Sequence, residues 1–446
     1  MTDDFAFATI AEIRAAYRNG RTTPVAVTEA ALRRAASLEP RLNAVVTLLR
    51  DTALREAEAA GRDLATGRDR GPLHGIPVAV KDLIDVAGAP TTFATQAVDP
   101  VWPARDATLV RHLREAGAVI LAKTNLLEFA YGIAHPAIGQ TNNPWDTGRT
   151  SGGSSGGSAA LVAAGVVPAA VGTDTGGSIR IPASYCGIVG VKPSFGLVST
   201  DGIFPLSQSL DHAGPIARTV ADAATLLAGM TGRAMPVVPR APAALRIGVV
   251  AAHRDSPLVT PGVRSAFLAA LNRLAAAGVH VTEVGLPGLN TVNDALMNVL
   301  LPEAALVHET LAASRPDGYA PGTAAQIKAG AAVSGLAYLR AQASRARLRA
   351  VVEHILSEVD VLLSPAVAFV APREDPALDA EGGDGEMLSS GLANVTGHPA
   401  LSLPCGLSDG LPVGLQLIAK TDSALLSCAT SIETILAFDA RPDLKA

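Results

Sequence analysis

Cysteine, aromatic and charged residues are all scarce in this chain, and each shortage narrows the class of protein. Only 3 of the 446 residues are cysteine, and no two of them form a CxxC motif. An odd and sparse set of cysteines argues against a disulfide framework and favours a reduced intracellular protein. Aromatic residues make up 4% and charged residues 17% of the chain, while 48% of the residues are hydrophobic. We therefore expect a folded globular protein whose core is largely aliphatic.

Basic clusters, membrane-spanning runs and cofactor motifs are missing as well. The formal net charge is −5, and without a basic run the sequence gives no sign of nucleic-acid binding. The N-terminal residues 1–5 are acidic and lack the hydrophobic region of a signal peptide. The most apolar stretch, 159–171, is shorter than the roughly 20 residues of a spanning helix. No HExxH or GxxxxGK[ST] motif occurs. We expect a cytoplasmic protein without metal or other cofactor that binds neither nucleic acid nor membrane.

Short apolar runs alternate with segments of helical periodicity, which is typical of an α/β fold. Helices are predicted within 9–65, at 106–116, at 263–277 and over most of 294–358. Strands are predicted at 76–80, 118–122, 245–250, 279–284, 361–365, 401–404 and 413–419, the first two of them as buried strands. Loops are expected at 143–150 and 372–387, the second near the surface. We expect one large domain with a central mixed β-sheet covered by helices on both faces.

Two glycine-rich clusters, 151–158 and 172–180, flank the apolar stretch and contain Ser154 and Ser178. Glycine lets the backbone approach closely and adopt positive φ. Tight turns on either side of a buried element can therefore bring serine hydroxyls and unpaired N–H groups into one pocket. This pattern indicates nucleophilic serine chemistry.

Ser178 is the leading candidate for the nucleophile. The preceding Thr175, Gly176 and Gly177 can turn successive N–H groups toward one point, where they would hold an oxyanion. A second possibility is the GxSxG pattern at 152–156, which formally matches the nucleophile elbow of α/β-hydrolases. That elbow needs a strand directly before it, and the preceding residues have the composition of a loop.

A serine nucleophile needs a base. None of the 9 histidines stands in a triad motif, and a structural role is favoured for His212, which lies nearest to the glycine clusters. Lys81 ends an apolar strand, where lost hydration favours the neutral amine that can accept a proton. Lys123 also ends an apolar run, so the pattern alone does not separate the two lysines.

Together with the glycine clusters, several flanking motifs resemble those of the amidase signature family. They are His74-Gly75-Ile76-Pro77 with Lys81-Asp82, Lys123-Thr124-Asn125 with Glu128-Phe129, Asn143-Pro144-Trp145, Cys186-Gly187, Gly190-Val191-Lys192-Pro193, Asn394 with Gly397-His398-Pro399-Ala400, and Gly410-Leu411-Pro412-Val413-Gly414-Leu415-Gln416. The resemblance is dense over about 60–230 and looser elsewhere. It implies one amidase domain over 1–446, with a catalytic core at about 60–230 and 394–420 and a variable substrate-side region at about 233–393.

The resemblance implies a Ser-Ser-Lys triad at Ser178, Ser154 and Lys81. Ser178 would be acylated, Ser154 would follow a cis peptide bond and relay the proton, and Lys81 would be the terminal base. Ser155 is the closest rival of Ser154. Asp174 and Arg180 would support the loop as structural charges.

The oxyanion hole implied by the resemblance consists of the N–H groups of Thr175, Gly176, Gly177 and Ser178. Substrate contacts are expected from Phe129, Tyr131 and Ile179.

Carboxylic amides are the substrate class that the resemblance implies, with carbamates, ureas and some esters as alternatives. The glutaminase component of tRNA-dependent amidotransferases has a similar core, but Ile181 and His212 stand where that component usually has glutamine. We therefore expect a small-molecule amidase that is a monomer or homodimer. The alternatives are a glutaminase component of an amidotransferase and a binding protein on an inactive amidase fold.

Overall fold

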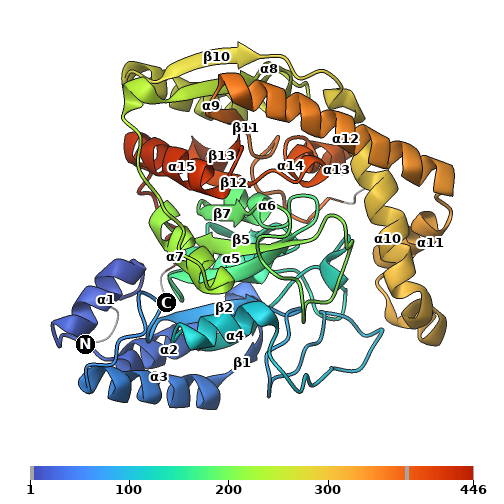
Figure 1. Cartoon of the computed structure of the whole chain (residues 1–446). Helices are drawn as coiled ribbons and strands as arrows, with labels where there is room; N and C mark the ends of the chain where they lie inside the picture. The colour runs from blue at the N-terminus through green and yellow to red at the C-terminus, as the bar shows by residue number, and fades with distance from the viewer. Residues whose placement is uncertain (1–4, 377–380, 445–446) are drawn as a thin grey trace.

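The structure, a computed structural model, describes residues 5–376 and 381–444. One mixed sheet of eleven strands runs through these residues, with helices packed on both of its faces (Figure 1). In sheet order the strands are β1 (Val45–Leu48), β3 (Val119–Thr124), β2 (Pro77–Lys81), β6 (Ala169–Asp174), β8 (His212–Ala217), β7 (Val189–Lys192), β12 (Ala400–Ser408), β13 (Leu411–Ala419), β11 (Val361–Pro365), β9 (Arg246–Val250) and β10 (His280–Val284).

The sheet contains two parallel groups joined by antiparallel strands. Strand β2 pairs in parallel with β3 and β6, and β9 pairs in parallel with β10 and β11. The strands between these groups, and β1 at one edge, run antiparallel to their neighbours. The predicted α/β class with a mixed central sheet is confirmed.

Helices from all parts of the chain pack on the sheet. They are α1 (Ile10–Arg18), α2 (Pro24–Leu42), α3 (Arg50–Ala65), α4 (Thr108–Glu115), α5 (Gly156–Ala163), α6 (Arg180–Cys186), α7 (Val220–Thr231), α8 (Ala251–Arg254), α9 (Pro261–Ala276), α10 (Val292–Ser314), α11 (Pro321–Ala331), α12 (Gly335–Glu358), α13 (Glu381–Met387), α14 (Gly391–Thr396) and α15 (Asp422–Leu436). Local sequence explains how the first of them begins. Thr9 and Glu12 form a reciprocal capping box, in which Thr9 Oγ1 accepts from the Glu12 N–H at 3.2 Å.

Both faces of the central strands are buried. Along β2, Val78 and Val80 face one hydrophobic cluster and Ala79 faces the other. Because successive side chains of a strand point to opposite faces, a strand covered on both sides becomes a continuous apolar run. This explains why 76–80 could be predicted as a strand from its composition.

Three segments differ from the prediction. Strand β1 interrupts the expected helical region 9–65, because this short β-branched segment pairs with the edge of β3. The expected loop 143–150 contains β5 (Asp146–Thr150), which forms a small hairpin with β4 (Asn142–Asn143). The expected surface loop 372–387 contains α13, and 377–380 lies outside the described residues. Glu386 in α13 is buried, and its carboxyl group accepts a hydrogen bond from Tyr185 Oη at 2.9 Å.

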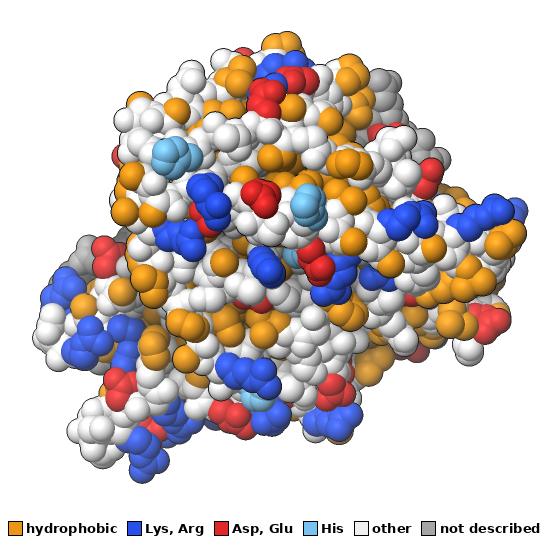
Figure 2. All heavy atoms as spheres, turned by 45° about the horizontal axis from the view of Figure 1, so that its top comes forward, with side chains coloured by type: hydrophobic (Ala, Val, Ile, Leu, Met, Phe, Trp, Pro, Cys, Tyr) orange, Lys and Arg blue, Asp and Glu red, His pale blue; other side chains and the backbone are white. Residues whose placement is uncertain are grey.

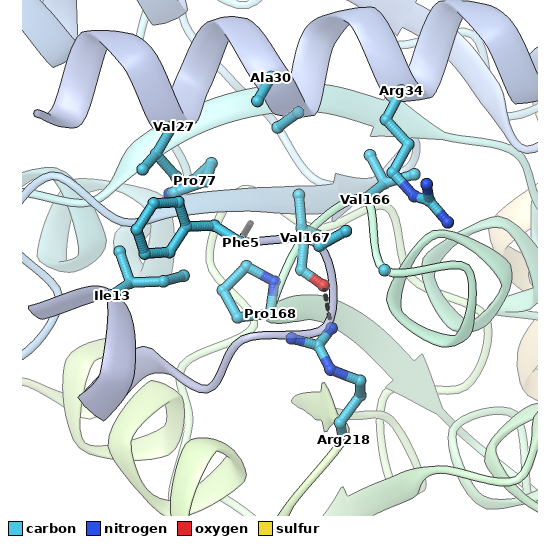
Figure 3. A pocket seen from close by; sticks show the side chains of 13 residues that line it. Phe5, Ile13, Val27, Ala30, Arg34, Pro77, Val166, Val167, Pro168 and Arg218 are labelled. Carbon is cyan, nitrogen blue, oxygen red and sulfur yellow. Dashed lines mark hydrogen bonds between the residues drawn. The ribbon is translucent and has the colours of Figure 1, made fainter. Parts of the chain in front are cut away.

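The N-terminal segment packs onto the body of the protein. Figure 3 shows the Phe5 ring beside Ile13, Val27 and Pro168, with Arg218 donating to the Val167 carbonyl at 2.8 Å. These residues leave a space of only about 20 Å³, roughly the size of one water molecule. This pocket is therefore a packing defect between the segment and the sheet rather than a substrate site.

The surface carries charges of both signs. On the face shown in Figure 2, lysine and arginine side chains are interspersed with aspartate and glutamate, and hydrophobic side chains lie between them. No helix within 5–376 and 381–444 is both long and apolar enough to cross a membrane.

Candidate active site

Lys81 is the last residue of β2 and is completely buried. Its Nζ lies 2.7 Å from Ser154 Oγ and 2.8 Å from Thr173 Oγ1. Thr173 belongs to the adjacent parallel strand β6, so the carboxyl ends of two parallel strands meet here. Binding sites of open α/β sheets commonly lie at such ends.

Burial lowers the pKa of Lys81 to about 7, although Asp174 and Asp211 act in the opposite direction. In the described part of the chain Lys81 forms no ion pair. A lysine with this pKa is a mixture of ammonium and neutral amine near neutral pH. The neutral amine can accept a proton from the hydroxyl that it contacts.

Lys123 has a different environment although it occupies a similar strand position. Its Nζ lies 2.7 Å from Asp82 Oδ1 and donates to Thr91 Oγ1 at 3.0 Å. Burial lowers the pKa of Lys123, while the charge and hydrogen bond of Asp82 raise it. The carboxylate therefore favours the charged form, so the structure separates the two lysines that the sequence pattern left equivalent.

Ser154 lies in the turn between β5 and α5, and the Gly153–Ser154 peptide bond is cis. A Cβ atom on Gly153 would lie 2.2 Å from Leu127 Cδ1, so a larger residue would displace Leu127. Glycine at this position lets the turn pack closely while Ser154 reaches Lys81.

Ser155 makes different contacts from Ser154. Its Oγ donates to the Thr173 carbonyl and accepts from the Thr173 N–H, both at 3.1 Å. The hydroxyl therefore joins the turn to the backbone of β6. The contact with Lys81 belongs to Ser154.

Ser178 lies in the second glycine turn, between β6 and α6, and is half-buried while its neighbours 172–177 and 179–180 are buried. The Ser155 N–H donates to the Ser178 carbonyl at 3.1 Å, which joins the two glycine turns. Among the described residues, no protein group accepts a hydrogen bond from the N–H of Thr175, Gly176, Gly177 or Ser178. The turn therefore offers free donors beside a partly exposed hydroxyl.

Side chains from other parts of the chain form hydrogen bonds with the second glycine turn and fix its position. Thr175 Oγ1 donates to Asp211 Oδ1 at 2.6 Å, and Ser390 Oγ donates to the Gly176 carbonyl at 2.5 Å. Gly177 has φ +146°, and a Cβ there would lie 2.5 Å from Ser390 Oγ. Both the backbone conformation and the lack of space require glycine at this position.

Beneath the turn lies the buried ion pair of Arg180 and Asp174, with Nη2 and Oδ1 2.9 Å apart. Burial alone would raise the pKa of Asp174, but the charge and hydrogen bonds of Arg180 hold it well below its usual range. Arg180 also donates to Gln416 Oε1 and Asn394 Oδ1, each at 2.6 Å. The network fixes both ends of the turn and involves the two C-terminal motifs, whose role the sequence did not reveal.

Replacing Arg180 with alanine should lower the free energy of unfolding by about 3–5 kcal/mol, because it leaves Asp174 buried and unpaired. Denaturant unfolding of the variant measures this loss. Arg111→Ala serves as a control, since it removes an exposed pair with Glu115 and should cost less than about 1 kcal/mol. Equal losses in the two variants would contradict the structural role of Arg180.

The three residues expected to contact substrate are buried. Phe129 and Ile179 are 0% exposed and Tyr131 is 1% exposed. Phe129 lies in an aromatic cluster, with its ring centroid 4.6 Å from that of His308. Tyr131 Oη has no hydrogen-bond partner among the described residues. Their role as substrate contacts stays a prediction.

Two polar residues at the site were not singled out by the sequence analysis. Thr173 contacts Lys81, and its only signal was its place in the second glycine cluster. Asp211 accepts from Thr175 and from the N–H groups of Leu206 and Ser207, at 2.9 and 3.1 Å. Burial raises the pKa of Asp211 to about 6. This side chain joins the turn to a loop distant in sequence, which no local pattern reveals.

His212 has the contacts of a structural residue. Its Nδ1 lies 2.6 Å from the Leu210 carbonyl and its Nε2 lies 3.1 Å from Lys192 Nζ. Burial lowers the pKa of His212 well below its usual value, so the ring is neutral. No group of three or more His, Cys, Asp or Glu side chains in the described ranges is placed to hold a metal ion.

The comparisons with known proteins agree with one another. A family model described as Amidase matches residues 26–425. An amidase of Pseudomonas putida is 40% identical over 425 residues, which cover 90% of each chain. A glutamyl-tRNA(Gln) amidotransferase component of Symbiobacterium thermophilum is 35% identical over 472 residues, with 95% of this chain and 96% of that protein covered. A solved structure described as an amidase matches with a TM-score of 0.89 and 39% identity, over 96% of this chain and 99% of that one.

With this fold and these relatives, the protein falls in the class of enzymes of α/β fold that hydrolyse C–N bonds. Within that class, the chain belongs to the amidase signature family.

Proposed function

We propose that the protein is a serine amidase in which Ser178 is the nucleophile, Ser154 relays the proton and Lys81 is the terminal base. The neutral amine of Lys81 takes the hydroxyl proton of Ser154, and Ser154 takes that of Ser178. The Ser178 oxygen bonds to the amide carbon at the same time. The carbonyl oxygen becomes an oxyanion that accepts hydrogen bonds from the N–H groups of Thr175, Gly176, Gly177 and Ser178.

Collapse of this intermediate breaks the C–N bond. The leaving nitrogen takes the Ser154 proton, and the Lys81 ammonium replaces it. The products of this step are a free amine, an ester on Ser178 and a neutral Lys81. Water then loses a proton through the same relay and attacks the ester. The carboxylic acid leaves and Ser178 regains its proton.

One observation carries the proposal more than any other. Lys81, buried and without an ion pair in the described part of the chain, lies 2.7 Å from the hydroxyl of Ser154. The other two fully buried lysines of the described ranges have different contacts, since Lys123 pairs with Asp82 and Lys192 donates to the Pro193 carbonyl at 2.9 Å, so of these three only Lys81 contacts a serine hydroxyl.

The rate of acylation should therefore rise with pH and level off above about pH 7. Burial lowers the pKa of Lys81 to about 7, and the relay requires the neutral form, which is lost as pH falls below that value. Single-turnover acylation between pH 5 and 9 measures the dependence. A rate that falls as pH rises through 7 would contradict a neutral lysine base.

Small carboxylic amides are the proposed substrates, and the proposed enzyme is a monomer or homodimer in the cytoplasm. A second candidate function is that of a glutaminase within a larger amidotransferase, favoured by 35% identity to a component of a glutamyl-tRNA(Gln) amidotransferase. Light scattering of the purified protein with an amidase assay separates the two. Full activity of a monomer or homodimer supports the amidase, whereas activity that depends on a second polypeptide supports the amidotransferase component.

A further inference from the structure

A cavity of about 520 Å³ lies beside the second glycine turn. Part of its wall follows the carboxyl ends of the parallel strands β9 and β10, where His253 and Leu289 lie. The rest comes from α10 and from the segment that leads into α14, including Leu296 and Met387. Its volume lies in the range of small-molecule sites, and strand ends of this kind are a common place for ligands.

The cavity and the glycine turn share a wall. A Cβ atom on Gly176 would lie 3.5 Å from Leu296 Cδ2 and 3.7 Å from Met387 Sδ. Leu296 and Met387 both line the cavity. The cavity therefore lies one layer of side chains away from the turn, and a group bound to the carbonyl carbon would enter it only by displacing or passing between Leu296 and Met387.

The lining is hydrophobic near the turn and carries no lysine or arginine among the described residues. Asn293 lines the cavity and donates to Asp384 Oδ1 at 3.1 Å. His253 is 3% exposed, and its Nδ1 has no partner in the described ranges. Burial lowers the pKa of His253 to about 4, so its ring is neutral. An anionic substituent would lose its hydration here without gaining a counter-charge, and a cation would find only the exposed carboxylate of Asp384, which already accepts from Asn293.

The chemistry of the proposed relay decides which part of the substrate faces the cavity. The leaving nitrogen must lie beside Ser154, since Ser154 returns its proton. The Ser154 turn is packed against Leu127 through Gly153, whereas Gly176 faces Leu296 and Met387. The two turns thus have different neighbours, and the proposal directs the leaving nitrogen to the Leu127 side and the acyl substituent to the Leu296 side.

We propose that this cavity binds the acyl substituent, and that the preferred substrates are amides of uncharged, hydrophobic carboxylic acids with several carbons. This inference rests on the proposed function of Ser178, Ser154 and Lys81. It also sets the protein apart from a glutaminase, whose acyl group carries an ammonium and a carboxylate.

A series of p-nitroanilides with acetyl, butyryl, hexanoyl and 4-phenylbutanoyl groups tests the proposal. In the wild type, kcat/KM should rise about three- to fourfold for each added methylene until the cavity is filled. Leu296→Trp should reduce kcat/KM for the hexanoyl compound by about 30-fold or more and for the acetyl compound by less than about threefold. Leu306→Trp is the control, because Leu306 lies on the same helix and is 72% exposed.

Leu289→Trp gives a second, independent blocking variant. Leu289 is half-buried on the cavity wall, so the larger side chain is easier to accommodate if Leu296→Trp fails to fold. It should cause the same selective loss of the longer substrates.

The inference is overturned if the wild type cleaves the acetyl and hexanoyl compounds equally well, or if both blocking variants slow all substrates alike. The assignment of the cavity to the acyl group is also overturned if kcat/KM varies with the size of the amine in a set of acetamides rather than with the length of the acyl group. In each of these cases hydrolysis through Ser178 stands. The proposed function itself would be wrong if Ser178→Ala still hydrolysed the substrates, or if the wild type hydrolysed none of the acyl compounds.

Discussion

Ser178→Ala should lower kcat on the order of 10⁵-fold without unfolding the protein, because it removes the atom that forms the acyl-enzyme. The side chain is half-buried, so the loss of its hydroxyl removes little packing. Circular dichroism and denaturant unfolding should therefore be close to those of the wild type. Steady-state hydrolysis of a p-nitroanilide measures the loss of activity.

Ser155→Ala is the matched control in the first glycine turn. Its hydroxyl bridges to the N–H and carbonyl of Thr173, so its loss should cost about 1–3 kcal/mol of stability. The folded fraction should keep its activity within about tenfold. If Ser155→Ala were folded but inactive while Ser178→Ala remained active, the assignment of Ser178 as the nucleophile would be wrong.

Lys81→Arg should slow acylation by about 10³-fold. Arginine keeps the positive charge but does not release its proton at any pH that proteins tolerate, so it cannot act as the base. The rise of activity through about pH 7 should disappear with the lysine, since burial places the pKa of Lys81 there. Single-turnover acylation at several pH values measures both effects.

Lys123→Arg tests the same substitution at the neighbouring strand. Arginine can keep the ion pair with Asp82, so folded protein should acylate within about tenfold of the wild-type rate and keep its pH dependence. Wild-type acylation by Lys81→Arg would contradict the relay, and so would loss of the pH dependence in Lys123→Arg alone.

The parts of the fold that could be predicted are those in which burial determines the composition. Segment 361–365 is buried on both faces of the sheet and was predicted as a strand with its observed bounds. Strand β1 and helix α13 were missed, because each depends on partners distant in sequence. Strand β1 requires the edge of β3, and Glu386 of α13 is held by Tyr185.

In the candidate site, too, the residues within local motifs could be predicted, and the contacts between distant segments could not. Glycine clusters and the family resemblance point to Ser154, Ser178 and Lys81, and the structure brings Lys81 to Ser154. The sequence could not separate Lys81 from Lys123, because the difference is a carboxylate contact formed only after folding. Nor could it find the contact of Thr175 with Asp211, which joins the turn to a loop that has no motif of its own.

The most direct test of the account is the position of the covalent intermediate. The wild type is treated with a fluorophosphonate, or quenched during turnover of a slow ester, and its intact mass is measured. Trypsin leaves Ser154, Ser155 and Ser178 on one peptide, since no lysine or arginine lies between Arg149 and Arg180. Cleavage before Asp174 separates Ser178 from the other two serines.

We expect one adduct per chain, carried by the fragment that begins at Asp174 and located on Ser178 by fragmentation. Ser178→Ala should carry none. An adduct on the fragment that ends before Asp174, or turnover without any covalent intermediate, would contradict the central claim.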